Sequence, residues 1–548
     1  MTERRSPVSA VSAKIVTSGE VSVTVADIAV YPVTEFFEST MESKMAQPTV
    51  IRLHANDDVL IATRQLLPGT AIDSEKVSVR DLIPPGHKMA AHDIKAGVPV
   101  RRYNQIIGFA KADIAAGQHV HTHNLGMGEF ERDYCIGQDV HELQKVAKPA
   151  MFMGYKRSNG KVGTRNYIAL ISSVNCSATV TRAIARHFTP DRLEAFPNVD
   201  GVMALPQPFG CGFNVNGETM HIMRRTMAGF ARHPNFAGVV FVGLGCEQNQ
   251  IEPLIEIIGR HEPDMLQQVV MQVEGGTAAA IRKGISLVEK MLPRANRYTR
   301  EEVSVSNLIV GLECGGSDGY SGITANPALG GASDLLVAHG ATTVLSETPE
   351  IYGAEHLLTR RARTLEIAQK LIDRIAWWKD YCARTGGEFN NNPSVGNKAG
   401  GLTTILEKSL GAVAKGGTSA LNGVYLYAEP VDIKGFVFMD TPGYDPVTAT
   451  GQAAGGAQII CFTTGRGSAF GCPGVPTLKL ASNNALYERM RDDMDINCGD
   501  LIDGTPMSEI SQRIFDAIVR HASGEKTRSE VLGYGNDEFV PWQVGAVM

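Results

Sequence analysis

Continuous apolar runs alternate with helix-like segments from about residue 151 to the end of the chain. Runs such as YIALISSV, GVVFVGLG and NLIVGLE are rich in apolar and β-branched residues, and a stretch with helical spacing of apolar positions follows each. This order is typical of parallel strands connected by helices, and unbroken apolar strands fit a sheet covered on both faces. The pattern predicts two doubly wound, Rossmann-like α/β domains, over residues 151–304 and 305–548.

The N-terminal part of the chain has a different pattern. Over residues 48–128, short apolar runs are separated by Pro-Gly and Ala-Gly turns, as in DLIPPGHKMA and DIKAGVPVRRY. Such punctuation favours a small β-rich domain. The polar segment 129–150 is expected to be a linker. Residues 1–47 are expected to be a disordered extension, with Met45 as an alternative start of the protein.

Composition and charge narrow the class of protein. The 548 residues are 43% apolar and 20% charged, which fits a soluble globular protein. The net charge of −6 and the absence of a long basic run argue against nucleic acid as a partner. The sequence has neither an apolar run of membrane-spanning length nor a signal-peptide core, so we expect a cytoplasmic protein with reduced thiols and no membrane partner.

Three of the apolar runs end on a cysteine, namely Cys176, Cys246 and Cys314, and Cys211 lies in the turn after a fourth run. The carboxyl ends of parallel strands line the crevice in which ligands bind, so distant thiols can meet there. Thiolates bind zinc, iron and iron–sulfur clusters, whereas a lone cysteine more often packs as a small apolar residue. We expect Cys176, Cys246 and Cys314 to be metal ligands, and we assign the five cysteines without this context to packing.

Histidines form a second candidate group. In QHVHTHN, the side chains of His119, His121 and His123 project from the same face if the segment is a strand. Imidazoles at such spacing suit metal binding or proton transfer near neutral pH, and a solvated edge strand is the alternative. His87 and Lys88 follow a Pro-Gly turn, where a loop either presents them to a ligand or leaves them simply exposed.

Glycine-rich loops supply the third group of candidates. The segment ECGGSDGYSGITANPALG combines glycines, which allow close backbone approach, with short hydrogen-bonding side chains. Two further glycine-rich turns each carry a cation suited to a carboxylate, although a solvated loop charge is the alternative. The candidate substrate-binding residues are Ser317, Asp318, Thr324, Asn326, Lys398 and Arg466.

Several of these motifs, taken in order, resemble the altronate/galactarate dehydratase family. The resemblance rests on GHKMA, HVHTHN, GLGCEQNQ, ECGGSDGYSGITANP, NPSVGNKAGG and FTTGRG, and it runs from about residue 50 to near the C-terminus. It implies an SAF domain at residues 48–128 and a hydro-lyase that converts a sugar acid to a 2-keto-3-deoxy acid. HVHTHN and PEIYGAEHLL are more similar to altronate enzymes, so D-altronate is the expected substrate. Galactarate, or another hydroxy acid such as sulfolactate, is the alternative.

The implied reaction removes a proton beside a carboxylate and expels a hydroxyl from the next carbon, so it needs a base and an acid. We expect these roles to fall, without ranking, to His87, Lys88, His121 and His123. Lys398 and Arg466 would hold the substrate carboxylate.

Two metal models stay open. The resemblance implies Fe²⁺, with Mn²⁺ as an alternative, held by carboxylate and by histidine such as His119. The other model is an iron–sulfur cluster on Cys176, Cys246 and Cys314 with one iron open to substrate. A homodimer is expected. The alternative of another class is a sugar-acid-binding regulator without catalysis.

Overall fold

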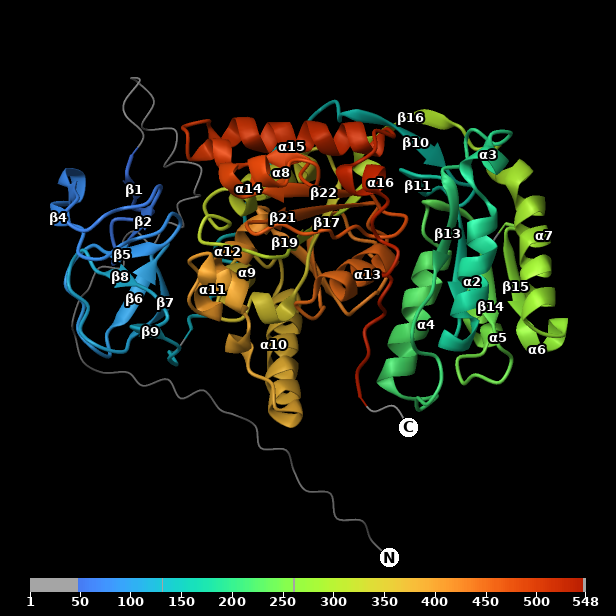
Figure 1. Cartoon of the computed structure of the whole chain (residues 1–548), viewed down its shortest axis with the longest axis horizontal. Coiled ribbons are helices and arrows are strands. Elements are labelled where there is room, and N and C mark those ends of the chain that lie inside the picture. The colour runs from blue at the N-terminus through green and yellow to red at the C-terminus, as the bar shows by residue number, and fades with distance from the viewer. Residues whose placement is uncertain (1–47, 131, 260–261, 546–548) are drawn as a thin grey trace, which may run out of the picture.

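The computed structural model describes residues 48–130, 132–259 and 262–545, which form three units (Figure 1). The N-terminal unit, in blue, and the unit that follows it, in green, lie at opposite ends of the molecule. The C-terminal unit lies between them and contacts both. The extension expected over residues 1–47 lies outside the described residues.

The N-terminal unit is built of short strands, as its turn-rich pattern predicts. One antiparallel sheet has the order β1-β2-β5-β8, a second has the order β6-β7-β9, and β3 pairs with β4. Most apolar side chains of these strands are buried, and part of this core is continuous with that of the C-terminal unit. The strands are β1 (Val50–Ile51), β2 (Val59–Ala62), β3 (Ala71–Ile72), β4 (Val77–Ser78), β5 (Lys88–Ala90), β6 (Pro99–Arg102), β7 (Gln105–Ala110), β8 (His119–Val120) and β9 (Leu125–Gly126).

The second unit contains a parallel sheet of order β13-β12-β14-β15 with helices on both faces. Alternate residues of β12 explain the two-sided cover: Ile168 and Leu170 pack with α2 and α7, whereas Ala169 and Ile171 pack with α4 and α5. The strands are β12 (Tyr167–Ser172), β13 (Gly201–Leu205), β14 (Phe236–Gly243) and β15 (Leu266–Val270). The helices are α2 (Asn175–His187), α3 (Pro190–Leu193), α4 (Glu218–Ala231), α5 (Ile251–Ile258), α6 (Met271–Glu274) and α7 (Thr277–Ala295).

A small antiparallel sheet, which the strand–helix alternation does not predict, closes the second unit. Its strands are β10 (Met151–Lys156), β11 (Val162–Gly163) and β16 (Arg300–Ser304), in the order β11-β10-β16. The first and last strands of the unit therefore pair with each other, with Met151 opposite Ser304. This pairing brings the two ends of the unit together beside the C-terminal unit.

The C-terminal unit is built on a seven-stranded parallel sheet of order β19-β20-β18-β17-β21-β22-β23. Helices α8 and α15 pack on one face, while α13 packs between the other face and α4 of the second unit. Its strands are β17 (Ile309–Cys314), β18 (Thr342–Leu345), β19 (Leu421–Tyr425), β20 (Gly435–Met439), β21 (Ile459–Thr464), β22 (Thr477–Ala481) and β23 (Ile496–Asn497). Its helices are α8 (Ala325–Ala338), α9 (Glu355–Thr359), α10 (Leu365–Thr385), α11 (Val395–Ala399), α12 (Ile405–Val413), α13 (Asp445–Gly455), α14 (Asn484–Arg489), α15 (Met507–Ala522) and α16 (Arg528–Leu532). No described helix combines the length and the apolar character that a membrane crossing needs.

Each parallel sheet has a point from which the chain builds outward in both directions. In the second unit, β12 is followed by β13 on one side and by β14 on the other. In the C-terminal unit, β17 is followed by β18 to β20 on one side and by β21 to β23 on the other. Ligands of open α/β sheets bind at the carboxyl ends of the strands at such a point. The β12/β14 and β17/β21 edges are therefore the places to search for sites.

Candidate active site

Three histidines of the N-terminal unit meet beside the C-terminal unit. His87 immediately precedes β5, His119 lies on the neighbouring strand β8, and His121 follows β8. Nδ1 of His87 lies 3.0 Å from Nε2 of His119, and the three residues offer ring nitrogens within 4.8 Å of one another. Nε2 of His87 also lies 3.3 Å from the carbonyl oxygen of Ala399 on α11. His123 is exposed, and its ring centroid lies 5.7 Å from that of His119.

The environment of these histidines favours neutral rings. Burial, reinforced by the Lys88 ammonium, lowers the pKa of His119 to about 4 and that of His121 to about 3. Burial also lowers the pKa of His87. Nδ1 of His121 is buried without a hydrogen-bond partner. Neutral imidazoles with a free nitrogen are able to bind a cation or accept a proton.

Lys88, predicted to carry protons, instead lies in a buried ion cluster that joins two units. Its ammonium is 2.8 Å from Oε1 of Glu407 on α12 and donates to the carbonyl of Gly401 at 2.6 Å. Arg102 of β6 reaches the same carboxylate at 2.6 Å, and none of the three side chains is more than 1% exposed. Although burial opposes ionisation, the two cations lower the pKa of Glu407 to about 2. The cluster therefore stays charged and holds the N-terminal unit against the C-terminal one.

A small pocket lies between these two units. Tyr103 of the N-terminal unit lines it together with Cys314, Glu407 and Lys408. Of the residues predicted to bind substrate, three line this pocket: Ser317, Asp318 and Asn326.

The remaining predicted binding residues lie elsewhere. The Thr324 hydroxyl donates to the carbonyl oxygens of Tyr320 and Ser482. Lys398 is partly buried on α11, and Arg466 is exposed after β21. None of the three is among the described residues that line the pocket.

A buried group of carboxyl groups and lysines lies beside the pocket, at the carboxyl end of β17. Cys314 contacts the Lys415 ammonium at 2.9 Å, and the same ammonium pairs with Glu347 at 2.7 Å. Lys408 pairs with Glu350 at 2.6 Å. Ligand atoms converge within 4.8 Å in two overlapping sets, which are Cys314, Glu347, Glu350 and Glu313, Glu347, Asp445. We call these residues, with the two lysines, the β17 carboxylate cluster.

Carboxyl groups outnumber ammonium groups in the β17 carboxylate cluster. Four carboxyl groups face two ammonium groups, and both oxygens of Glu313 and one of Glu347 are buried without a hydrogen-bond partner. Burial and the neighbouring carboxylates raise the pKa values of Glu313 and Glu347, and raise that of Asp445 to about 7. A divalent cation would neutralise this excess, and an oxygen-rich donor set suits Fe²⁺, Mn²⁺ or Mg²⁺. The residues therefore fit a bound cation.

Sequence reasoning identified only Cys314 of the β17 carboxylate cluster. The available signal was the same as for the cysteines, since Glu313 is the last residue but one of β17 and Glu347 and Glu350 follow the neighbouring strand β18. Acidic residues are common in loops, so these carboxyl groups did not stand out in the sequence.

The predicted cysteine ligands do not meet at one site. Cys314 belongs to β17 of the C-terminal sheet, whereas Cys176 lies on α2 and Cys246 follows β14 in the second unit. Cys314 is buried, while the other two are exposed. The expectation took all three strands as neighbours, but the chain divides them between two sheets.

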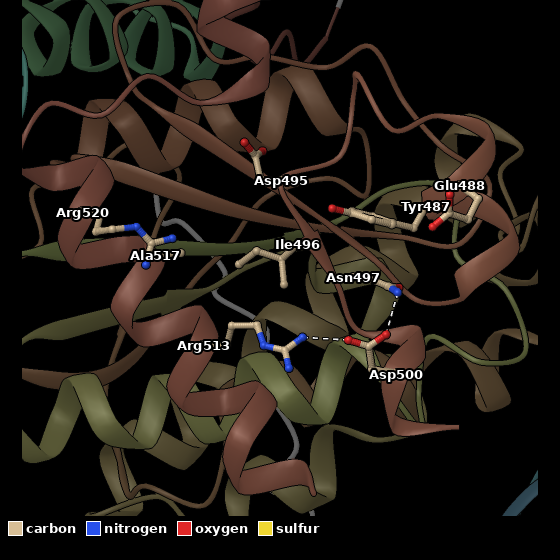
Figure 2. Close-up of a pocket in the computed structure, with 9 residues that line it drawn as sticks. All are labelled: Tyr487, Glu488, Asp495, Ile496, Asn497, Asp500, Arg513, Ala517 and Arg520. Atoms are coloured by element: carbon tan, nitrogen blue, oxygen red, sulfur yellow. Dashed lines mark hydrogen bonds and ion pairs between the residues drawn. The ribbon is translucent and has the colours of Figure 1, made fainter. Parts of the chain in front are cut away.

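A more open pocket, of about 360 Å³, lies beside edge strand β23. Figure 2 shows its polar lining, with the guanidinium of Arg513 turned toward the carboxylate of Asp500 and with Asn497 beside it. The Arg513–Asp500 pair is 2.7 Å long, and both side chains are more than a third exposed. This pocket contains none of the predicted site residues, so its side chains serve below as controls.

Comparison with known proteins gives matches along almost the whole chain. The altronate dehydratase of Escherichia coli K12 is 37% identical over 88% of this chain and 96% of its own length. The altronate dehydratase of Bacillus subtilis 168 is 35% identical with the same coverage. The galactarate dehydratase (L-threo-forming) of Escherichia coli K12 is 35% identical over 91% of this chain and 98% of its own length.

Family models match each of the three units. Residues 48–128 match the altronate/galactarate dehydratase SAF domain, and residues 154–296 match the D-galactarate dehydratase/altronate hydrolase second domain. Residues 305–547 match the D-galactarate/altronate dehydratase C-terminal domain. The chain belongs to the altronate/galactarate dehydratase family.

Proposed function

We propose that this protein is a hydro-lyase that removes water from a sugar acid, with D-altronate as the first candidate substrate and a 2-keto-3-deoxy acid as product. The observation that carries the proposal is the match to two altronate dehydratases over 96% of the length of each. The galactarate dehydratase, matched over 98% of its length, makes galactarate the second candidate. The pocket between the SAF domain and the β17 carboxylate cluster is where we place the substrate.

The reaction develops negative charge on the substrate carboxylate as the neighbouring proton leaves, and further charge on the departing hydroxyl. A divalent cation, Fe²⁺ first and Mn²⁺ second, would stabilise that charge when bound. We assign this cation to Glu313, Glu347 and Asp445. Cys314 and Glu350 lie next to this set and contact Lys415 and Lys408, respectively. The uncompensated buried carboxyl groups support this assignment, and the three-histidine group of the SAF domain is the alternative cation site.

Proton transfer falls to side chains of the SAF domain. His87 and His121 are neutral at physiological pH, so each has a nitrogen lone pair that can accept a proton, and His123 lies exposed beside them. Lys408 lines the pocket and offers positive charge to a substrate carboxylate. We assign Lys88 a structural role and no proton transfer, because its ammonium is held by Glu407 and the Gly401 carbonyl.

The test is turnover of defined sugar acids by protein loaded with Fe²⁺ without oxygen. D-altronate, galactarate, gluconate and sulfolactate are incubated separately, and 2-keto-3-deoxy acid formation is measured. We expect the highest kcat/KM with D-altronate, and the Arg513→Ala variant, altered in the open pocket of Figure 2, should match the wild type. Binding of altronate without turnover, with or without metal, would support a regulatory sugar-acid-binding protein instead.

Metal content separates the two cation sites. Glu347→Gln should reduce bound Fe²⁺ strongly if the β17 carboxylate cluster holds it, whereas His119→Ala should leave the metal content unchanged and slow turnover. Loss of bound Fe²⁺ in His119→Ala, with unchanged Fe²⁺ in Glu347→Gln, would instead assign the cation to the three histidines.

We infer also that both parallel sheets are of the doubly wound, Rossmann-like kind, because each has strands on both sides of its first strand. We propose a cytoplasmic location, which the nine free cysteines support. A homodimer is proposed on the general prevalence of symmetric pairs, and light scattering would test it.

A further inference from the structure

The three exposed cysteines of this protein all lie at one edge of the second unit. Cys176 is in the first turn of α2 after β12, Cys211 is in the loop after β13, and Cys246 is in the loop after β14. The other six cysteines are partly or fully buried. Free cysteine is among the most buried residue types, so three exposed thiols on one sheet edge are unusual for packing.

Hydrogen bonds tie the three cysteine-bearing loops to one another. The amide of Asn175 donates to the Phe209 carbonyl at 2.8 Å, which joins the first loop to the second. The amide of Asn249 donates to the Gly210 carbonyl at 3.1 Å, and its side chain donates to the Ser173 carbonyl at 3.0 Å. The third loop is thereby joined to both others. Each cysteine lies within three residues of a residue that makes one of these hydrogen bonds.

Glycine makes this close approach feasible. Gly210 has φ +105°, and a Cβ at this position would lie 2.3 Å from the Ser173 carbonyl oxygen. A side chain there would push the Cys211 loop away from the Cys176 loop. Gly245, with φ +124°, gives the same freedom just before Cys246. The positive φ angles of these two glycines therefore allow the three cysteine-bearing loops to pack closely together.

This edge is also the topological switch point of the second sheet. Cys176 follows β12 and Cys246 follows β14, the two adjacent strands from which the chain builds outward in opposite directions. The Gln272 side-chain amide donates to Sγ of Cys246 at 3.4 Å, the kind of contact that stabilises a thiolate ligand. A first helical turn, where Cys176 lies, favours negative charge.

We propose that Cys176, Cys211 and Cys246 bind an iron–sulfur cluster, a [4Fe–4S] centre with one iron lacking a protein thiolate. The three exposed thiols lie on hydrogen-bonded loops at one sheet edge, and three thiolates are the ligand number of a cubane cluster with one iron left open. The site is separate from the pocket beside the SAF domain, because the second unit lies at the far end of the molecule from that domain (Figure 1). The inference goes beyond the proposed dehydration and does not depend on it.

The experiment measures iron, acid-labile sulfide and visible absorption of the full-length protein, produced with added iron and purified without oxygen. The single variants Cys176→Ser, Cys211→Ser and Cys246→Ser are compared with Cys382→Ser, which changes a partly buried cysteine on α10. We expect about four sulfide ions per chain in the wild type and in Cys382→Ser. Each of the three site variants should lose most of the sulfide and the charge-transfer absorption.

Acid-labile sulfide separates this site from the β17 carboxylate cluster, which would hold iron without sulfide. Loss of sulfide with retention of about one iron per chain would support both sites independently. Wild-type protein that contains iron or zinc but no sulfide would overturn the cluster, as would full sulfide in the triple cysteine variant. Circular dichroism of each variant confirms that a loss of sulfide is not a loss of fold, since the substituted side chains are exposed.

Discussion

Replacement of Glu407 by glutamine tests whether the buried ion cluster holds the SAF domain in place. The substitution keeps the shape of the side chain and removes the negative charge shared by Lys88, at 2.8 Å, and Arg102, at 2.6 Å. Both cations stay buried, because Lys88 is also fixed to Gly401 and Arg102 to Gly319. The variant therefore has two buried positive charges without a counterion.

Two routes give a similar magnitude for this change. Removal of one partner from a buried ion pair destabilises a protein by about 3–5 kcal/mol. Independently, the pKa of Glu407 falls from the ordinary 4.5 to about 2, which corresponds to about 3 kcal/mol of stabilisation by the ionised form. We expect Glu407→Gln to lower the free energy of unfolding by about 3–5 kcal/mol at pH 7.

The assay is urea unfolding followed by circular dichroism, together with limited proteolysis in the segment 129–150 that connects the SAF domain. The matched control is Glu301→Gln, which removes an exposed pair with Lys156 and should change the free energy by less than about 1 kcal/mol. Cleavage of the connecting segment should accelerate in Glu407→Gln and not in the control. Lys88→Met added to Glu407→Gln should restore part of the lost stability, because one unpaired charge is gone.

The pH dependence has a definite sign. A carboxyl group with a lowered pKa stabilises the folded state above its unfolded pKa, and the effect disappears as pH falls through the folded value. The difference between wild type and Glu407→Gln should therefore be constant above pH 4.5 and shrink toward pH 2. A difference below about 0.5 kcal/mol at pH 7, with unchanged proteolysis, would refute the view that this cluster holds the domains together.

Three further outcomes follow from the sites. Without added metal, the unfolding free energy should fall by up to about 1.4 kcal/mol per pH unit between pH 4 and 7. The reason is the raised pKa of Asp445: in this range the folded protein keeps the proton on Asp445, whereas the unfolded chain loses it. Asp445→Asn should flatten this slope in urea titrations. His121→Ala should reduce kcat by about 10²–10⁴-fold while the unfolding midpoint stays near that of the wild type, and a midpoint that falls with unchanged kcat would make the residue structural. Gly210→Ala should lower the melting temperature and the sulfide content together, because the new methyl group meets the Ser173 carbonyl oxygen, and unchanged sulfide would show that the loop contact is unnecessary.

The sequence pattern located the strands well but could not assign them to sheets. Cys176, Cys246 and Cys314 each follow or end an apolar strand, as predicted, yet β17 lies in a different sheet from β12 and β14. Sheet membership depends on packing between residues far apart in sequence, which local periodicity does not report. Cys211 was placed in the turn after a fourth apolar run but was not named as a ligand, although its loop is the neighbour of the other two.

Long-range pairing also explains why the role of Lys88 was not predictable. Its partner Glu407 lies 319 residues further along the chain, and an isolated lysine after a Pro-Gly turn gives no sign of burial. The same holds for Glu347 and Asp445, which resemble ordinary loop acids until the fold encloses them. Histidine spacing is different, because nearness in sequence already brings the rings of His119 and His121 together, with centroids 5.2 Å apart. The predicted strand through His123 is wrong, since β8 ends at Val120 and a turn follows it.

The two switch points differ in the chemistry that each environment permits. The carboxyl groups at the end of β17 lie beside the pocket that Tyr103 of the SAF domain lines, where a cation and its oxygen ligands would attract strongly because water is excluded. Thiolates form largely covalent bonds to iron and do not need such exclusion, which fits the exposed position of the cysteine loops at the end of β12 and β14. The SAF domain docks on the C-terminal unit through Lys88 and Arg102, which pair with Glu407, and through His87, whose ring contacts the Ala399 carbonyl on α11. Release of that domain would admit water to the pocket, so it should weaken binding of the cation while leaving the sulfide content of the second unit unchanged.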